Sequence, residues 1–376
     1  MKHKVCTKCL LDTTVKDIWF DTEGICKYCY IYDELNSNFP LNHNLSHRLD
    51  EIVRKIKQKG KRAKYDCVVG LSGGRDSTYT LYKAVSLGLK PLAVHFDNGW
   101  NTEISIKNIK NACETLDVEL YTVVADWEEF RKLQLAFLHA STPDADIPTD
   151  YAIYSILYNV AAKENIKFIL NGHSFRTEGT SPISWTYMDP IYVKDVLRKH
   201  GEIRKVKSFS MMSFVRLQYY IWLRGIREVR LLEYIDYVKK DVDVILENEL
   251  SWRYYGGHHH ENSFTKFFQS YYLPVKFDID KRKTELSAMI RSGHIKRNSA
   301  IELLSEKYKY DSSDISFALK KLQITSDEWN VIMNNEIKSH QDFKTLLSVI
   351  KALKWPLNII TKLGILPRIL YLKYAK

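Results

Sequence analysis

The sequence lacks any long apolar run. No stretch of the 376 residues reaches the roughly 18 consecutive apolar residues that a membrane-spanning helix needs. The N-terminus, MKHKVCTKCLLD, also lacks the apolar core of a secretory signal peptide. These absences exclude an obligatory membrane span, and we expect a cytoplasmic location. Because 45% of the residues are hydrophobic and 27% charged, we expect a folded chain of two or three units.

Acidic residues are absent from the end of the chain. Residues 344–376 hold seven Lys and Arg and no Asp or Glu. The net charge of the chain is +11, so the +7 of this tail leaves +4 for all the rest. The high pI therefore indicates a basic tail rather than a nucleic-acid groove, and we expect no nucleic-acid partner. The tail has three interpretations: peripheral contact with an anionic membrane, docking on a partner subunit, or packing on this protein's own body.

Cysteine is scarce after the first 29 residues. Four of the six cysteines form two C-x-x-C pairs, Cys6 with Cys9 and Cys26 with Cys29. In an intracellular protein such clustering favours metal over disulfides. Four thiolates complete a tetrahedral Zn²⁺ shell, which supplies on the order of 10 kcal/mol to a unit too small for its own core. We predict a structural zinc ribbon over residues 1–35, with an iron–sulfur cluster or a redox dithiol as alternatives.

The middle of the chain alternates apolar runs with amphipathic segments. An amphipathic helix is expected over 45–58. Strands are then expected at 65–70, 91–97, 119–125 and 167–171, with helices at 77–87, 102–116, 127–139 and 150–164. This alternation predicts an α/β fold with a doubly wound parallel sheet, which binds ligands at the carboxyl ends of its strands. We assign 45–205 to this domain.

The remainder of the chain is expected to be mostly helical. Helices are predicted at 209–224, 230–248 and 280–333, and an irregular, aromatic-rich segment at 252–274. We therefore assign 206–340 to a helical substrate or partner region and 341–376 to the basic amphipathic tail.

A glycine-rich loop, SGGRDS, follows the first strand. It comprises Ser72, Gly73, Gly74, Arg75, Asp76 and Ser77. Glycines let backbone N–H groups converge on an anion, and serine hydroxyls can add further donors. A carboxylate beside phosphate is unfavourable unless both hold Mg²⁺, so Asp76 predicts a magnesium site. The sequence assigns no role to Arg75.

Polar residues also follow the second and fourth strands. Asp97 and Asn98 either orient a ligand or, for Asp97, open a tight turn. After the fourth strand, Gly172 permits close approach to a nucleotide and His173 is a candidate for proton handling. Arg176 is a candidate to stabilise charge that develops on phosphate.

The S-G-G-x-D-S pattern of residues 72–77 resembles the signature of the PP-loop ATP pyrophosphatases, which have an adenine-nucleotide α-hydrolase-like fold. The resemblance implies that the loop grips the pyrophosphate of ATP and that AMP and pyrophosphate are formed. It places His95 and Asp97 beside the adenine. Glu178 lies six residues after Gly172, the spacing at which ammonia-using NAD synthetases place a metal-binding glutamate. Asp76 and Glu178 would then hold Mg²⁺.

Several segments together resemble the N-acetyl sugar amidotransferases of flagellin-glycan and surface-polysaccharide biosynthesis, including the lipopolysaccharide O-antigen of bacteria. These segments are VCTKC with ICKYC, YDCVVGLSGGRDS, LAVHFDNGWNTE, NGHSFRTEG and WRYYGGHHHENSFTKFFQSYYLP. The resemblance implies that ATP adenylates an acetamido oxygen of a nucleotide-linked sugar. Ammonia then displaces AMP and leaves an acetamidino group. Trp252, Arg253 and Tyr255, with Asn98, would contact the sugar nucleotide, although an aromatic core patch is an equal interpretation.

The resemblance also implies partners. Cys67 and Cys113 lack the context of a nucleophile elbow, so ammonia would come from a separate glutaminase resembling that of histidine biosynthesis. A cyclase-like barrel subunit is a further candidate partner. A metal cluster at His258, His259, His260 and Glu261 is not favoured, because adjacent histidines rarely converge on one ion.

Two other functions are considered. A tRNA-thiolating PP-loop enzyme would need further cysteines for sulfur relay, and only Cys67 and Cys113 remain beyond the zinc quartet. A catalytically inactive scaffold would not need the complete 72–77 loop and Glu178.

Overall fold

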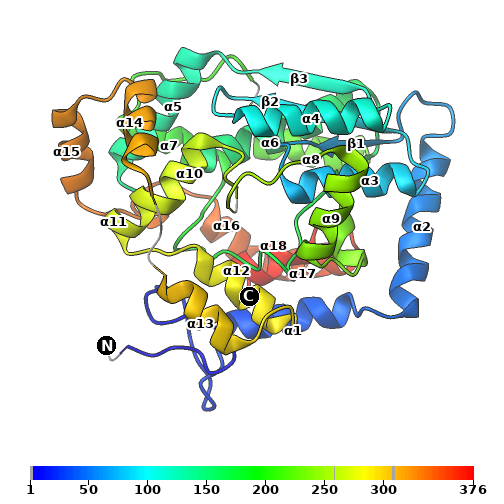
Figure 1. The fold of residues 1–376 in the computed structure, drawn as a ribbon, viewed down its shortest axis with the longest axis horizontal. Helices are drawn as coiled ribbons and strands as arrows, with labels where there is room; N and C mark the ends of the chain where they lie inside the picture. Colours follow the sequence, from blue (N-terminus) through cyan, green and yellow to red (C-terminus); the bar gives the residue numbers. More distant parts are fainter. Residues whose placement is uncertain (1–2, 210, 258, 307–309) are drawn as a thin grey trace.

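Five parallel strands form the sheet at the centre of the protein (Figure 1). The structure, a computed structural model, describes residues 3–209, 211–257, 259–306 and 310–376. The strands are β1 (Cys67–Gly70), β2 (Pro91–Asp97), β3 (Leu120–Val124), β4 (Phe168–Asn171) and β5 (Arg227–Arg230). Their order is β3-β2-β1-β4-β5, and every neighbouring pair is parallel. The strand β1, which carries the glycine-rich loop, is therefore central.

Helices cover both faces of the sheet. Alternate strand residues belong to different core clusters: Val68 and Val94 to one, Val69 and Ala93 to the other. On the first side lie α5 (Trp127–Ala140), α6 (Ile147–Lys163) and α7 (Pro190–His200), and on the second α2 (His43–Lys59), α3 (Arg75–Ser86), α4 (Glu103–Thr115) and α9 (Lys239–Leu250). The doubly wound parallel sheet predicted from the sequence is confirmed.

Side-chain caps fix where these helices begin. Asn42, Thr102 and Asp126 accept hydrogen bonds from the backbone N–H groups of the first turns of α2, α4 and α5. Helix α6 begins at Ile147, three residues before its predicted start. Pro148 lies in its first turn, where a proline is tolerated because no intrahelical donor is needed there.

The helix predicted over 230–248 is wrong at its start. Residues Arg227–Arg230 form β5, which pairs with β4 and is followed by a 3-10 helix, η2 (Leu231–Tyr234), before α9. The sequence Arg-Glu-Val-Arg has no apolar alternation because β5 is a short edge strand. The sheet thus extends past residue 205, the boundary expected from the sequence. The helix predicted over 209–224 is α8 (Phe214–Gln218) continued by a π-helix, η1 (Tyr219–Leu223).

The aromatic segment 252–274 was predicted to be irregular, and this prediction is wrong for its second half. This half is a helical run made of α10 (Ser263–Phe267), a π-helix η3 (Phe268–Tyr272) and α11 (Leu273–Phe277). Phe264, Phe267 and Phe268 are fully buried in the core. The expected helices of 280–333 are α12 (Arg282–Arg291), α13 (Arg297–Ser305), α14 (Ser312–Leu322) and α15 (Ser326–Asn334).

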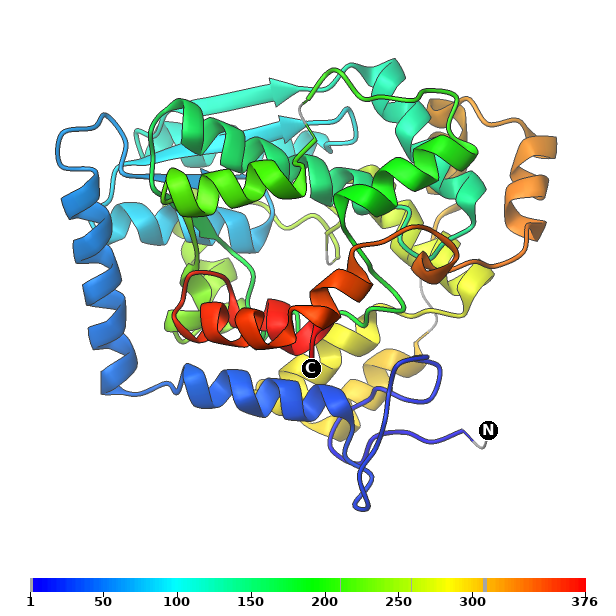
Figure 2. The ribbon, with the colours of Figure 1, turned by 180° about the vertical axis from the view of Figure 1, so that it is seen from behind.

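The first helix and the C-terminal helices lie near one another on one side of the molecule (Figure 2). The cysteine unit leads into α1 (Lys27–Asn38), and Lys283 of α12 contacts Asp12 at 2.7 Å. The tail forms α16 (Leu347–Ala352), α17 (Lys354–Lys362) and α18 (Arg368–Tyr374). Arg368 and Lys376 each lie 2.6 Å from Glu34 of α1, so the last helix packs on the protein itself. Among the described residues, no helix has the length and apolar character to cross a membrane.

Candidate active site

A cavity of about 340 Å³ lies at the carboxyl ends of β1, β2 and β4. Its wall comes from four parts of the chain: the 72–77 loop, the residues after β2 and β4, helix α6, and the segment from 255 to 281. This is where a doubly wound sheet binds its ligands. The cavity therefore joins the sheet to the C-terminal helices.

The glycine-rich loop is held tightly from outside the cavity. Gly73 has a φ of +78°, and a Cβ there would lie 2.3 Å from the carbonyl oxygen of Ser105. The indole Nε1 of Trp252 and the amide Nδ2 of Asn108 donate to the Gly73 carbonyl at 3.0 and 3.1 Å. Only glycine fits this position, and the loop is fixed before any ligand binds.

The polar groups of the loop face one another and the cavity. The hydroxyls of Ser72 and Ser77 lie 3.1 Å apart, and the N–H of Gly74 donates to Ser72 at 3.2 Å. Helix α3 begins directly after Gly74, so its N-terminal N–H groups and dipole favour an anion at this place.

Arg75 does not point at the expected phosphate position. Its guanidinium binds the carboxylate of Asp243 on α9, with Nη2 2.8 Å from Oδ2. It also lies over the ring of Tyr254, at 5.4 Å from the centroid. The backbone N–H of Arg75 donates to the hydroxyl of Tyr255 at 3.1 Å. Arg75 therefore anchors the loop, a role that the sequence did not indicate.

Asp76 and Glu178 lie together in the cavity wall. Burial and the neighbouring Glu178 carboxylate raise the pKa of Asp76 to about 8. Although burial acts against it, His173 holds the pKa of Glu178 well below its usual range, with Nδ1 2.5 Å from Oε2. Two carboxylates forced together in this way are the oxygen donors that Mg²⁺ prefers. The pair fits a magnesium ion, with His173 orienting one ligand.

Gly172 makes this arrangement possible. A Cβ at this residue would lie 2.8 Å from both the carbonyl oxygen of Asp76 and Oγ1 of Thr80. The absence of a side chain therefore lets the end of β4 approach α3 closely enough to bring Glu178 toward Asp76.

The residues at the carboxyl end of β2 and directly after it divide between the cavity and a turn. His95 and Asn98 line the cavity. The His95 ring nitrogens lie 2.9 Å from the Leu71 carbonyl oxygen and 3.1 Å from Asn101 Nδ2. Asp97 accepts from the N–H of Gly99 at 2.9 Å and does not line the cavity. The structure supports the second interpretation of Asp97, in which its carboxylate opens a tight turn.

Three predicted site residues lie elsewhere. Arg176 is fully buried outside the cavity, and its guanidinium donates to the carbonyls of Glu233 and Phe39. The expectation that it meets phosphate is wrong, because these two hydrogen bonds hold the guanidinium at η2 and at the end of α1. Trp252 is buried behind the loop, and the backbone of Arg253 pairs with Asn108. Neither lines the cavity, whereas Tyr255 does.

The sequence analysis missed a second polar wall. Asp146 is the N-cap of α6 and lies four residues before Asp150 of that helix. Across the cavity, Thr265 of α10 and Gln269 of η3 have the same four-residue spacing, and Glu261 lies two residues before α10. Residues four apart share a helix face. The helix predicted over 150–164 included Asp150 but not Asp146, and 252–274 was predicted to be irregular, so the spacing was not recognised as a shared face.

This wall is held together by its own contacts. Thr265 Oγ1 donates to Asp146 Oδ2 at 2.8 Å. The Glu261 carbonyl accepts from the N–H of Thr102, and the Trp100 carbonyl accepts from the N–H of Ser263 at 2.8 Å. Of the histidine cluster that the sequence did not favour, His258 lies outside the described residues. Within the described residues, only the cysteine quartet forms a group of three or more potential metal ligands.

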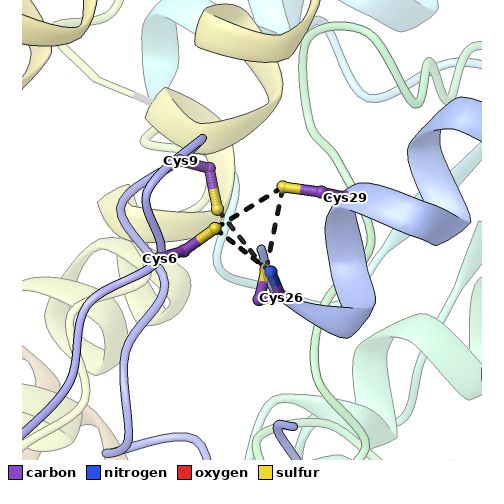
Figure 3. A group of neighbouring side chains, drawn as sticks. All are labelled: Cys6, Cys9, Cys26 and Cys29. Atoms are coloured by element: carbon purple, nitrogen blue, oxygen red, sulfur yellow. Dashed lines mark hydrogen bonds between the residues drawn. The ribbon is translucent and has the colours of Figure 1, made fainter. Parts of the chain in front are cut away.

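The four cysteine sulfurs converge on one point (Figure 3). Their Sγ atoms lie within 4.8 Å of one another, with separations of 3.6 Å for Cys9–Cys26 and 3.8 Å for Cys6–Cys29. A tetrahedron with metal–sulfur bonds of about 2.3 Å has edges of about 3.8 Å. The quartet therefore has the size of a four-thiolate zinc site and is compatible with structural zinc.

Two family profiles match the chain. Residues 66–154 match the queuosine biosynthesis protein QueC, and residues 261–354 match the C-terminal domain of the LPS biosynthesis protein WbpG-like family. The first match includes the 72–77 loop and Asp146, and the second begins at Glu261, where the second polar wall begins.

Individual relatives are more distant. The uncharacterized protein MJ1599 of Methanocaldococcus jannaschii is 25% identical over 174 residues, which are 46% of this chain and 59% of that protein. This chain thus spans less than two thirds of the relative's length. The NH3-dependent NAD synthetase of Campylobacter jejuni is 16% identical, over 55% of this chain and 93% of that chain, with a TM-score of 0.28. The NMN synthetase of Francisella tularensis is also 16% identical, over 57% and 97%, with a TM-score of 0.29.

The sheet, the SGGRDS loop at the end of its central strand and the QueC match define a PP-loop ATP pyrophosphatase domain. The segment that closes the cavity from 261 onward is WbpG-like. The two matches together support a relation of this chain to the WbpG-like PP-loop amidotransferases.

Proposed function

We propose that this protein converts an acetamido group of a nucleotide-linked N-acetyl sugar to an acetamidino group at the expense of ATP. In the proposed reaction the acetamido oxygen attacks the α-phosphorus and pyrophosphate leaves. Ammonia then adds to the imidate carbon and AMP leaves with the former amide oxygen. The observation that carries this proposal is the Asp76–Glu178 pair beside the SGGRDS loop, in a cavity that a WbpG-like segment closes.

The charge of the cavity supports a metal–nucleotide complex over a free anion. Five carboxylates line it, Asp76, Asp146, Asp150, Glu178 and Glu261, and they outnumber the lining cations Arg75 and Lys281. A triphosphate would be repelled by so many like charges unless a cation accompanied it. Asp76 and Glu178 would hold Mg²⁺, which neutralises phosphate charge when bound. The N–H groups of the 72–77 loop would hold the pyrophosphate, and His173 would keep Glu178 oriented.

The second polar wall is the proposed place of the sugar. Carboxylates accept hydrogen bonds from hydroxyls, and the amide of Gln269 can both donate and accept. Thr265 fixes the Asp146 carboxylate in one orientation. The sugar hydroxyls would thus form hydrogen bonds with Asp146, Asp150 and Gln269, while the acetamido group faces the 72–77 loop.

The positions of the remaining cysteines support an external source of ammonia. Cys67 and Cys113 are buried in the core beside the sheet, and neither lines the cavity. Burial raises the pKa of Cys113 to about 11, which disfavours the thiolate that glutaminase chemistry or sulfur relay needs. We therefore propose a separate glutaminase subunit, with a cyclase-like barrel subunit as a candidate conduit. The same observation disfavours tRNA thiolation.

The cysteine quartet is proposed to hold a structural Zn²⁺. Arg291 of α12 approaches two of the sulfurs, with Nη1 3.9 Å from Sγ of both Cys9 and Cys29. This cation would offset part of the negative charge of four thiolates. The metal would then fix the N-terminal unit against α12, next to the C-terminal helices.

A direct assay tests the reaction. The purified chain would be incubated with ATP, Mg²⁺, an ammonium salt and a panel of nucleotide-linked N-acetyl sugars. We expect AMP and pyrophosphate in equal amounts, and a sugar product whose mass differs by exchange of O for NH. Release of ADP and phosphate would contradict the mechanism, and AMP formation without any modified sugar would contradict the substrate class.

A further inference from the structure

Helices α16 and α17 leave an apolar surface uncovered. The exposed fractions of its side chains are 46% for Val349 and Leu353, 78% for Trp355, 56% for Ile359 and 69% for Leu363. We call these five residues the tail face. In Figure 2 the two helices lie toward the viewer, above α1. By contrast Ile369 and Leu372 of α18 are buried, so only the first part of the tail lacks a cover.

Exposed lysines alternate along the chain with the residues of the tail face. Lys351, Lys354 and Lys362 are exposed, and no acidic residue occurs between 343 and 376. In the described part of the chain, no carboxylate forms an ion pair with any of these three lysines. The other cations of the tail behave differently, since Arg368 and Lys376 turn inward to Glu34. The exposed side chains of α16 and α17 thus combine apolar groups with positive charge.

A second exposed apolar strip lies on the same side of the molecule. It belongs to α8 and η1, where Val215 is 76% and Leu223 is 78% exposed. These elements lie at the back of Figure 1 and toward the viewer in Figure 2, as α17 does. Exposed apolar side chains therefore occur in two segments on this side of the molecule.

We propose that the tail face docks on the surface of an anionic lipid bilayer. An amphipathic basic helix with an exposed tryptophan lies in the headgroup region, where its apolar side chains enter the acyl boundary and its lysines meet anionic headgroups. With no helix among the described residues able to span a membrane, the segment lies on the bilayer. This proposal does not rest on the proposed reaction.

Charge argues against a second copy of this chain as the occupant. In a symmetric dimer the same patch meets itself, so the three lysines of each copy would approach those of the other. No carboxylate of the tail is present to offset them. Anionic headgroups supply the missing negative charge and an apolar layer together.

Vesicle cosedimentation of the full chain tests the proposal. We expect sedimentation with phosphatidylcholine vesicles that contain phosphatidylglycerol and little with phosphatidylcholine alone, and we expect added salt to weaken binding. Replacing Lys354 by Glu should lower the affinity for the anionic vesicles at least about fivefold, since each lysine near an anionic surface contributes roughly 1 kcal/mol. Equal sedimentation with both kinds of vesicle, or with neither, would overturn the proposal.

A matched pair of variants separates this surface from general hydrophobicity. Ile359→Glu alters the tail face, whereas Ile106→Glu alters an isoleucine of α4 with a similar exposed fraction, 53% against 56%. We expect Ile359→Glu to reduce vesicle binding about tenfold or more and Ile106→Glu to leave it unchanged, with both variants retaining the wild-type melting temperature. Equal effects of the two variants would overturn the proposal. The proposal would also be overturned if the Ile359→Glu variant differed from the wild type in solution mass, measured by light scattering without vesicles. That result would identify a protein interface.

Discussion

The guanidinium of Arg75 lies against the carboxylate of Asp243, so helix α9 holds the 72–77 loop through an ion pair. The two side chains are 13% and 27% exposed. A partly buried pair of this kind positions the backbone that carries the loop N–H groups. Loop geometry in this protein therefore depends on a helix about 170 residues further along the chain.

Asp243→Ala should impair ATP binding more than turnover. Removing one partner leaves the Arg75 cation partly buried without its counter-charge, and the loop loses its fixed position. We expect the KM for ATP to rise about tenfold, with a smaller change in kcat. Asp241→Ala, on the same helix but exposed, is the control and should behave as wild type. A kcat loss at unchanged KM would contradict the positioning role.

Asp76→Asn and Glu178→Gln should each abolish most activity. Each removes one charge from the two-carboxylate site, and we expect kcat/KM to fall at least about a hundredfold. Asp97→Asn provides the contrast: its carboxylate closes a turn outside the cavity, so its effect should be much smaller. Steady-state AMP release at varied Mg²⁺ measures kcat/KM for each variant. Comparable losses for all three variants would contradict the assignment of Asp76 and Glu178 to the metal site.

The second polar wall should control the sugar and not the nucleotide. Gln269→Ala is expected to raise the KM for the sugar about tenfold, from the loss of one or two hydrogen bonds, while the KM for ATP stays unchanged. Lys266→Ala, in the same helical run but paired with Asp314 at 2.7 Å, is the control. If Gln269→Ala raised only the KM for ATP, the sugar would have to bind elsewhere.

The purified chain should contain one zinc ion per chain. Elemental analysis of Cys26→Ser should show loss of the metal and a lower melting temperature, because a closed four-thiolate site contributes directly to folding. Cys113→Ser, which alters a buried cysteine outside the quartet, should keep its zinc. Iron in place of zinc, with visible absorbance, would indicate a cluster instead.

The sequence predicted the parts of the structure that depend on local pattern. The strands β1 to β4, the loop 72–77 and the cysteine pairs follow from apolar runs, glycines and short spacings, and the structure has all of them. It could not place Arg176, whose direction depends on contact with Phe39 and Glu233 far away in the chain. Nor could it identify β5, since an edge strand buries too little apolar surface to leave a pattern.

The second polar wall shows a different limit. The four-residue spacing of Asp146 with Asp150 was present in the sequence. It acquires meaning only because Glu261, Thr265 and Gln269 face it from another helical run. A periodic polar face is ordinarily a solvated one, and only tertiary contact shows that this one lines a cavity.

The backbone bonds that tie Glu261 and Ser263 to residues 100–102 have a consequence for engineering. The nucleotide domain and the WbpG-like segment are not interchangeable modules. A truncation after residue 250 would remove one wall of the cavity and the Tyr255 hydroxyl that meets the loop. Chimeras between relatives should therefore exchange the segment from 251 onward together with residues 100–108, so that both sides of this contact come from the same protein.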